Sequence, residues 1–117
     1  MNDDLPKLSS LTGEQLSSVT FVADYVQLDF NGPRLTAFSS PIVEVDGIRH
    51  RFPAPGSRDA LCSLIQQFVS HADAQDGRSI ELTFDSGARL SISLEADAYE
   101  GPEAATFSDP RASGLLV

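Results

Sequence analysis

The stretch PGSRDALCSLIQQF, residues 55–68, carries the one convincing helical pattern in a sequence that otherwise looks strand-like. Its apolar side chains recur at i, i+3, i+4 and i+7, which places on one helical stripe Leu61, Leu64, Ile65 and Phe68. Ser57 is the expected N-cap, because its hydroxyl can accept a hydrogen bond from a free N–H of the first turn. The spacing therefore predicts a helix that begins at Ser57 and includes Phe68.

A helix of this length is marginal alone in water, so its apolar stripe needs a platform. Burial of the four side chains contributes roughly 6–12 kcal/mol before the entropy cost is subtracted. Most of the remaining sequence alternates apolar and polar residues in short runs between turn residues, a pattern typical of strands. We therefore expect an α+β fold, a mostly antiparallel β-sheet of about six or seven strands in hairpins and meanders with one main α-helix packed on the sheet.

The strand pattern is clearest in four runs, residues 16–22, 24–30, 80–84 and 90–94. In the last three runs the apolar residues share one face, and the face toward the core is expected to hold Val26, Leu28, Phe30, Ile80, Leu82, Phe84, Leu90, Ile92 and Leu94. A further strand from Leu35 should break near Ser39-Ser40-Pro41, since proline removes a ladder donor.

Three turns set the expected registers. Asn31-Gly32 resembles a two-residue hairpin turn, but Pro33 lacks the N–H that such a turn requires. A four-residue loop is therefore predicted at residues 31–34, with Phe30 opposite Leu35 and Leu28 opposite Ala37.

Asp46-Gly47 predicts a two-residue hairpin with Val45 opposite Ile48, Glu44 opposite Arg49 and Val43 opposite His50. Residues 85–87 predict a three-residue loop with Gly87 in a left-handed conformation, which sets Leu82 opposite Leu90. Residues 73–77 are interpreted as a turn after the helix.

The two ends of the chain differ from the middle. Residues 1–10 are polar and form an expected loose lead-in, with Leu5 or Leu8 available to dock, and residues 11–117 form the expected single α+β domain. From Ala96 onward we expect irregular structure that Phe107 and residues 115–117 pin against the body.

The two halves show related spacings. One half has Leu11, Leu16, Val26, Leu28, Phe30 and Leu35, and the other has Leu64, Val69, Ile80, Leu82, Phe84 and Leu90. An internal duplication predicts two meanders related by a pseudo-twofold axis. Alternating strands also generate such matches by chance, so both interpretations stay open.

Three segments carry a resemblance: FVADYVQLDFNGP at 21–33, PGSRDALC at 55–62 and GPEAA at 101–105. Together they resemble an uncharacterised family of small bacterial proteins of unknown function. The similarity covers most of the chain from Leu11 onward. It implies a folded domain of this size and supplies no catalytic residue.

Charge is the unusual global property: 17 acidic against 8 basic residues give a net charge of −9. This balance argues against nucleic acids and anionic membranes as partners, because both are bound through Lys and Arg. A single cysteine, Cys62, excludes an internal disulfide, and the acidic N-terminus and the lack of a long apolar run do not resemble a signal or membrane segment. We expect a cytoplasmic protein.

No residue set has the spacing of a catalytic or metal site. Cys62 could pair with His50 or His71, but a buried cysteine on the flank of the helix is the stronger interpretation. Asp24 and Asp29 fall on opposite faces of a strand, and Asp73 and Asp76 lack the remaining ligands of a calcium loop. Arg49 and Arg51 are interpreted as cross-strand partners of Glu44 and not as an anion clamp. We therefore predict no catalytic, cofactor or metal residue and no cofactor.

The hypothesis favoured by the sequence is a small acidic protein-binding module, of the immunity or inhibitor type, for a basic protein partner. Its candidate partner-binding residues are acidic positions on strands without basic neighbours: Asp29, Glu81, Asp85 and Glu95. Two alternatives remain, a small-ligand-binding or enzymatic domain with a pocket between helix and sheet, and a homodimer joined through a strand edge.

Overall fold

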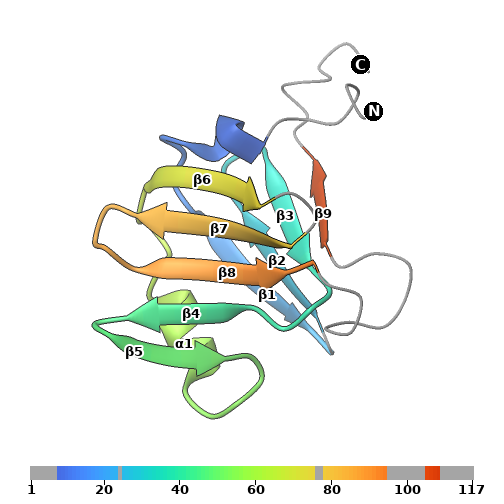
Figure 1. Ribbon diagram of the computed structural model, residues 1–117, viewed down its shortest axis with the longest axis vertical. Helices are drawn as coiled ribbons and strands as arrows, with labels where there is room; N and C mark the ends of the chain where they lie inside the picture. Colours follow the sequence, from blue (N-terminus) through green and yellow to red (C-terminus); the bar gives the residue numbers. More distant parts are fainter. Residues whose placement is uncertain (1–7, 24, 76–77, 95–104, 109–117) are drawn as a thin grey trace.

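A break at residues 38–41, at the expected Ser39-Ser40-Pro41 site, separates strands of two antiparallel sheets (Figure 1). The computed structural model describes residues 8–23, 25–75, 78–94 and 105–108. The first sheet has the order β1 (Ser18–Val22), β2 (Tyr25–Asp29), β3 (Arg34–Ala37), β9 (Ala105–Ser108). The second has the order β5 (Ile48–Arg51), β4 (Ile42–Val45), β8 (Arg89–Ser93), β7 (Ser79–Phe84), β6 (Val69–Gln75). The described residues also form two helical segments, a 3₁₀ turn η1 (Leu8–Leu11) and the helix α1 (Ser57–Cys62).

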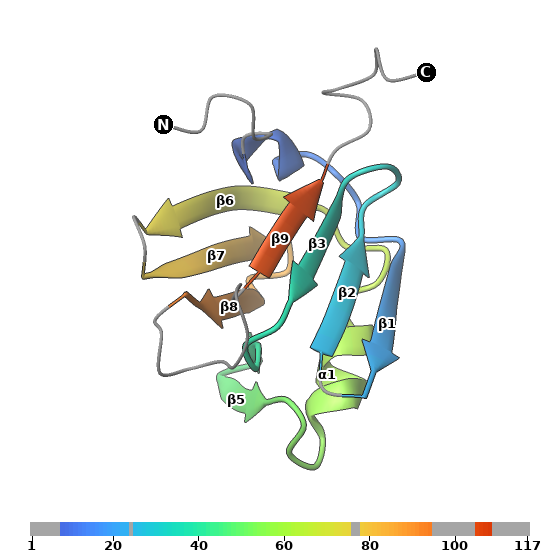
Figure 2. The same cartoon turned by 90° about the vertical axis from the view of Figure 1, so that its right-hand side faces the viewer.

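The core lies between the two sheets, whose strands cross steeply in Figures 1 and 2. Each sheet contributes one apolar face to a single buried cluster, with Val26, Leu28 and Leu35 from the first and Val43, Leu82 and Leu90 from the second. In the runs 24–30 and 80–84, the residues expected to face the core are buried. In the run 90–94, Leu90 and Ile92 are buried and Leu94 is partly buried.

The mostly antiparallel α+β class is confirmed, but the expectation of one sheet covered by one main helix is wrong. The described residues form nine strands instead of six or seven, and the main cover of each sheet is the other sheet. The helix α1 contacts β4 and β5 of one sheet and β1 of the other, so it fills a corner between them (Figure 2). A six-residue helix has too little apolar surface to cover a sheet, whereas the inner face of a second sheet has enough.

The helix is shorter than the sequence predicts. It ends at Cys62, although Leu61 and Leu64 are fully buried and Ile65 is partly buried, as expected. The N-cap is Gly56, with a left-handed φ of 88°, and no side chain caps the helix. Ser57 is instead the first helical residue, and its buried hydroxyl has no hydrogen-bond partner among the described residues. The prediction that Ser57 caps the helix is therefore wrong.

Backbone pairing with the N-terminal segment ends the helical stretch. The N–H of Gln66 donates to the carbonyl of Leu16 at 2.7 Å, and the N–H of Leu16 donates to the carbonyl of Gln67 at 3.0 Å. Gln66 adopts a left-handed φ of 79°, which a continuing helix cannot contain. Phe68 then pairs with Gln15 and is 45% exposed, so its predicted place on the buried stripe is wrong.

Two of the three predicted hairpin registers are confirmed. In the 46–47 hairpin, Val45, Glu44 and Val43 lie opposite the expected partners on β5. In the 85–87 loop, Gly87 has a φ of 95°, and Leu82 lies opposite Leu90.

The register at Asn31-Gly32 is wrong by two residues: Leu28, and not Phe30, lies opposite Leu35. The turn tolerates Pro33 because the N–H of Phe30 still donates to the carbonyl of Pro33 at 2.8 Å, so only the reciprocal hydrogen bond is missing. Loss of one net hydrogen bond costs about 1 kcal/mol, and Asn31, at a φ of 58°, has the left-handed conformation that a two-residue hairpin turn requires.

Two strands lie where the sequence predicts turns or irregular structure. β6 extends through Gln75, so a turn does not begin at residue 73, and β9 covers residues 105–108 in the expected irregular tail. Phe107 does pack against the core, as predicted, while residues 115–117 lie outside the described residues. Leu8 also packs against the core, and Leu5 lies outside the described residues. Within the described ranges, no helix is long and apolar enough to cross a membrane.

Candidate functional site

Of the sheet faces, the outer face of the five-stranded sheet carries the most charged side chains at paired strand positions. This face is turned toward the viewer in Figure 1. Strand alternation points Val43, Leu82 and Leu90 into the core and their neighbours in sequence outward. Two cross-strand rows result. One contains Arg49, Glu44, Arg89, Thr83 and His71, and the other contains Arg51, Ile42, Ser91, Glu81 and Asp73.

Charge on this outer face is segregated by strand. The half formed by β5, β4 and β8 holds three arginines, Arg49, Arg51 and Arg89, against one carboxylate, Glu44. The half formed by β7 and β6 holds Glu81 and Asp73 as opposed neighbours. We refer to these as the arginine half and the acidic half. A protein of net charge −9 thus collects three of its 8 basic residues at one end of one sheet.

The three arginines of this face are exposed and form no ion pair with the described part of the chain. The register places Glu44 opposite both Arg49 and Arg89, as the sequence predicts for the first of them. Glu44 therefore lies opposite the arginine expected from the sequence, but the two side chains form no ion pair.

The other described arginines on regular elements have partners. Nε of Arg34 donates to Oδ1 of Asp29 at 2.8 Å. The guanidinium of Arg58, on α1, lies 5.0 Å from the ring centre of Phe52, in the turn after β5, and 5.6 Å from that of Phe21 on β1, a cation–π arrangement. Arg34 and Arg58 therefore have a contact within the fold, whereas the three arginines of the arginine half form no ion pair with the described residues.

A shallow hollow of about 250 Å³ lies where the two halves meet. Ser91, half-buried, lies in the register between Ile42 and Glu81, so a small polar residue occupies the floor. The charged side chains around the hollow are Glu44, Arg49, Glu81 and Arg89. Such an arrangement can bind a small charged group, and the four side chains come from four different strands.

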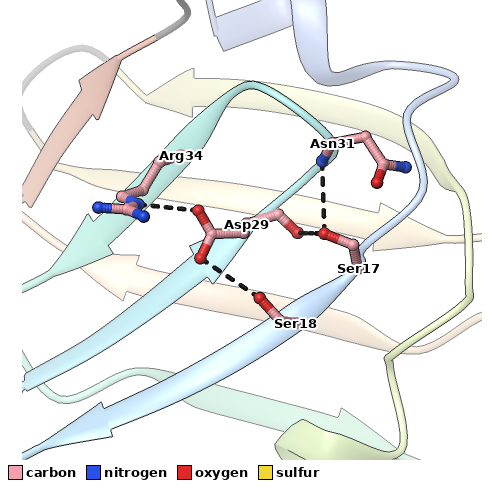
Figure 3. Close-up of polar contacts among 5 residues, drawn as sticks. All are labelled: Ser17, Ser18, Asp29, Asn31 and Arg34. Carbon is pink, nitrogen blue, oxygen red and sulfur yellow. Dashed lines mark hydrogen bonds and ion pairs between the residues drawn. The ribbon is translucent and has the colours of Figure 1, made fainter.

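Asp29 is the sequence-predicted site residue for which the structure gives the clearest alternative role (Figure 3). Its carboxylate accepts from Nε of Arg34 and from Oγ of Ser18, at 2.8 and 3.3 Å. Its carbonyl accepts from Oγ of Ser17 at 2.9 Å, and the same hydroxyl accepts from the N–H of Asn31 at 3.4 Å. The expectation that Asp29 has no basic neighbour is wrong, and its side chain holds the β2–β3 turn to β1.

The other three predicted residues do not join Asp29 in one surface. Glu81 lies on the outer face of the five-stranded sheet and borders the hollow. Asp85 is exposed in the β7–β8 turn, where its N–H donates to the carbonyl of Phe68. Glu95 lies outside the described residues. Asp29 belongs to the four-stranded sheet, so the acidic candidates are distributed over both sheets.

Cys62 is exposed at the end of α1, and not buried beside the apolar stripe as the sequence suggests. It forms no side-chain hydrogen bond with His50, His71 or any other described residue. Among the described residues, no group of three or more His, Cys, Asp or Glu side chains is placed to hold a metal ion.

The sequence alone indicates part of this site. It pairs Glu44 with Arg49, but it does not indicate Arg89, because only the pairing of β4 with β8 brings that residue opposite Glu44. The helix and three further strands, β5, β6 and β7, lie between these two strands in the chain, and no local sequence pattern indicates such a pairing. Comparison with family models, curated proteins and solved structures finds no match for this chain.

Proposed function

We propose that this protein is a cytoplasmic, non-catalytic binding module that recognises another protein through the outer face of the five-stranded sheet. The observation that carries the proposal is the charge segregation of that face, with three arginines that have no ion-pair partner among the described residues. Exposed charges at fixed register positions suit recognition, because complementary charges set orientation and reject wrong partners. The face is also built on paired strands, and the backbone of such pre-organised surfaces usually moves little on binding.

The proposed partner is basic overall, and the mode of action is that of an immunity or inhibitor protein. The net charge of −9 supports this part, since long-range attraction accelerates encounter with a basic surface. Contact then depends on the local charges: basic groups of the partner lie over Glu81 and Asp73, and an acidic group lies over the arginine half.

A homodimer through the edge of β5 is less favourable. Antiparallel pairing of two β5 edges would bring Arg49 and Arg51 of each copy close to the same residues of the other. Like charges directly opposite destabilise a strand pair, and charged edge residues are a common protection against such pairing. Light scattering on the purified protein measures this alternative directly.

The test is affinity capture from the native lysate, followed by association kinetics with the purified partner. Two variants change the face, Arg89→Glu and Glu81→Lys, and two matched variants make the same charge changes elsewhere, Arg34→Glu on the other sheet and Asp59→Lys on α1. We expect both face variants to raise the dissociation rate by at least about tenfold, because each removes a local contact, and the matched variants to change the association rate alone. Raised ionic strength should slow association of the unaltered protein.

Equal binding by the unaltered protein and both face variants would show that this face is not the interface. An association rate that does not change with salt would separately remove the role of the net charge in steering.

A further inference from the structure

We infer that the hollow around Ser91 is a carboxylate-binding site that accepts one aspartate or glutamate side chain of the protein partner. The inference rests on the proposed function and assigns the partner chemistry of the same face. Arg49 and Arg89 line the hollow, and neither forms an ion pair with the described residues.

The geometry of these donors suits a planar acceptor with two oxygens. A guanidinium group presents N–H donors in a rigid fork that matches a carboxylate. Ser91 adds a hydroxyl donor at the floor, and its side chain has no hydrogen-bond partner among the described residues. An incoming carboxylate can therefore receive hydrogen bonds from a wall and from the floor of the hollow.

The acidic residues of the lining limit the charge of the ligand. Glu44 and Glu81 also border the hollow, and the whole chain has a net charge of −9. A phosphate dianion would meet repulsion from both carboxylates. A single carboxylate balances the one excess positive charge that Arg49, Arg51 and Arg89 have over Glu44 and Glu81 on this part of the face. The charges of this part of the face therefore favour a monoanion over a dianion.

The size of the hollow and its acidic neighbour indicate that the carboxylate belongs to a protein segment. At about 250 Å³ and open to solvent, the hollow is smaller than the range typical of sites that enclose a whole small molecule. Glu81 and Asp73 lie directly beyond Ser91 in the same cross-strand row. A basic residue that neighbours the bound aspartate or glutamate in the partner can thus pair with the acidic half.

The test uses nuclear magnetic resonance titration of the ¹⁵N-labelled protein with three probes. The first is the acetylated and amidated peptide Lys-Gly-Gly-Asp, the second is the same peptide with Asn in place of Asp, and the third is inorganic phosphate. We expect the Asp peptide to shift the amides of Glu44, Arg89 and Ser91 and to bind at least about tenfold more tightly than the Asn peptide. Phosphate should bind more weakly than the Asp peptide.

Variants assign the binding to the arginine half. Arg89→Gln and, separately, Arg49→Gln should each weaken binding of the Asp peptide several-fold, while Arg34→Gln on the other sheet should leave it unchanged. The amide spectrum of each variant verifies that the fold is retained, which is expected because these side chains are exposed.

Equal affinity for the Asp and Asn peptides, tighter binding of phosphate, or shifts centred on Arg34 would overturn the inference. The two proposals fail separately. If the face variants abolish partner capture but the Asp peptide shows no preference, the carboxylate site alone is wrong. If the peptide binds as expected but partner capture ignores the face variants, the proposed function alone is wrong.

Discussion

At the scale of single residues, two buried serines differ in whether their hydroxyl has a hydrogen-bond partner. Oγ of Ser39 donates to the carbonyl of Ser93 at 2.7 Å and ties the crossover between the sheets to β8. Oγ of Ser57 is buried at the start of α1 without a partner among the described residues. Burial of a hydroxyl without a hydrogen-bond partner destabilises the folded state. A hydrogen bond made in the folded state offsets this cost.

We expect Ser39→Ala to lower the free energy of unfolding by about 1 kcal/mol, because it removes a buried hydrogen bond. Ser57→Ala should change it by less than about 0.5 kcal/mol or raise it, since no bond is lost and alanine favours the helix. Urea unfolding of both variants and the unaltered protein measures this difference. A loss at Ser57 as large as that at Ser39 would mean that its hydroxyl has a partner after all.

At the scale of elements, the segment from α1 to β6 changes from helix to strand pairing within a few residues. Ser63 still donates its N–H to Asp59 O in the α-helical pattern, and Leu64 and Ile65 then form the tighter i−3 hydrogen bonds. Beyond Gln66 the backbone pairs with residues 13–16 instead. Leu64 therefore stays in the core, while Phe68 leaves it.

We expect Leu64→Ala to lower the free energy of unfolding by about 2–5 kcal/mol, because it opens a cavity in a fully buried position. Phe68→Ala should cost less than about 1 kcal/mol, since its ring is 45% exposed. Urea denaturation with equal m-values provides the comparison. Similar losses for the two variants would place Phe68 in the core and contradict the early end of the helix.

At the scale of the whole molecule, the net charge of −9 opposes compaction as well as favouring basic partners. Raising sodium chloride from about 0.01 M to about 0.15 M shortens the Debye length from about 30 Å to about 8 Å. We expect the urea midpoint to rise over this range, because screening reduces repulsion among the carboxylates. A falling midpoint would show that local pairs such as Asp29–Arg34 dominate the electrostatics of the folded state.

The sequence by itself determined the features that depend on neighbouring residues. Period-two alternation predicts which side of β2, β7 and β8 enters the core, because a strand turns each successive side chain to the opposite face. Asp46-Gly47 and Gly87 predict their hairpin registers, because left-handed backbone angles select these residues locally. The opposition of Glu44 and Arg49 in the candidate site follows from the first of these turns.

Only the tertiary structure decided the features that depend on residues far apart in the chain. The helix ends at Cys62 because residues 66–69 pair with residues 13–16, which overrides an unbroken apolar stripe. The division into two sheets and the addition of β9 to β3 are also long-range pairings. Arg89 lies opposite Glu44 only because β4 pairs with β8. Backbone hydrogen bonds of this kind use the same N–H and C=O groups at every position, so local side-chain patterns do not specify which strands they join.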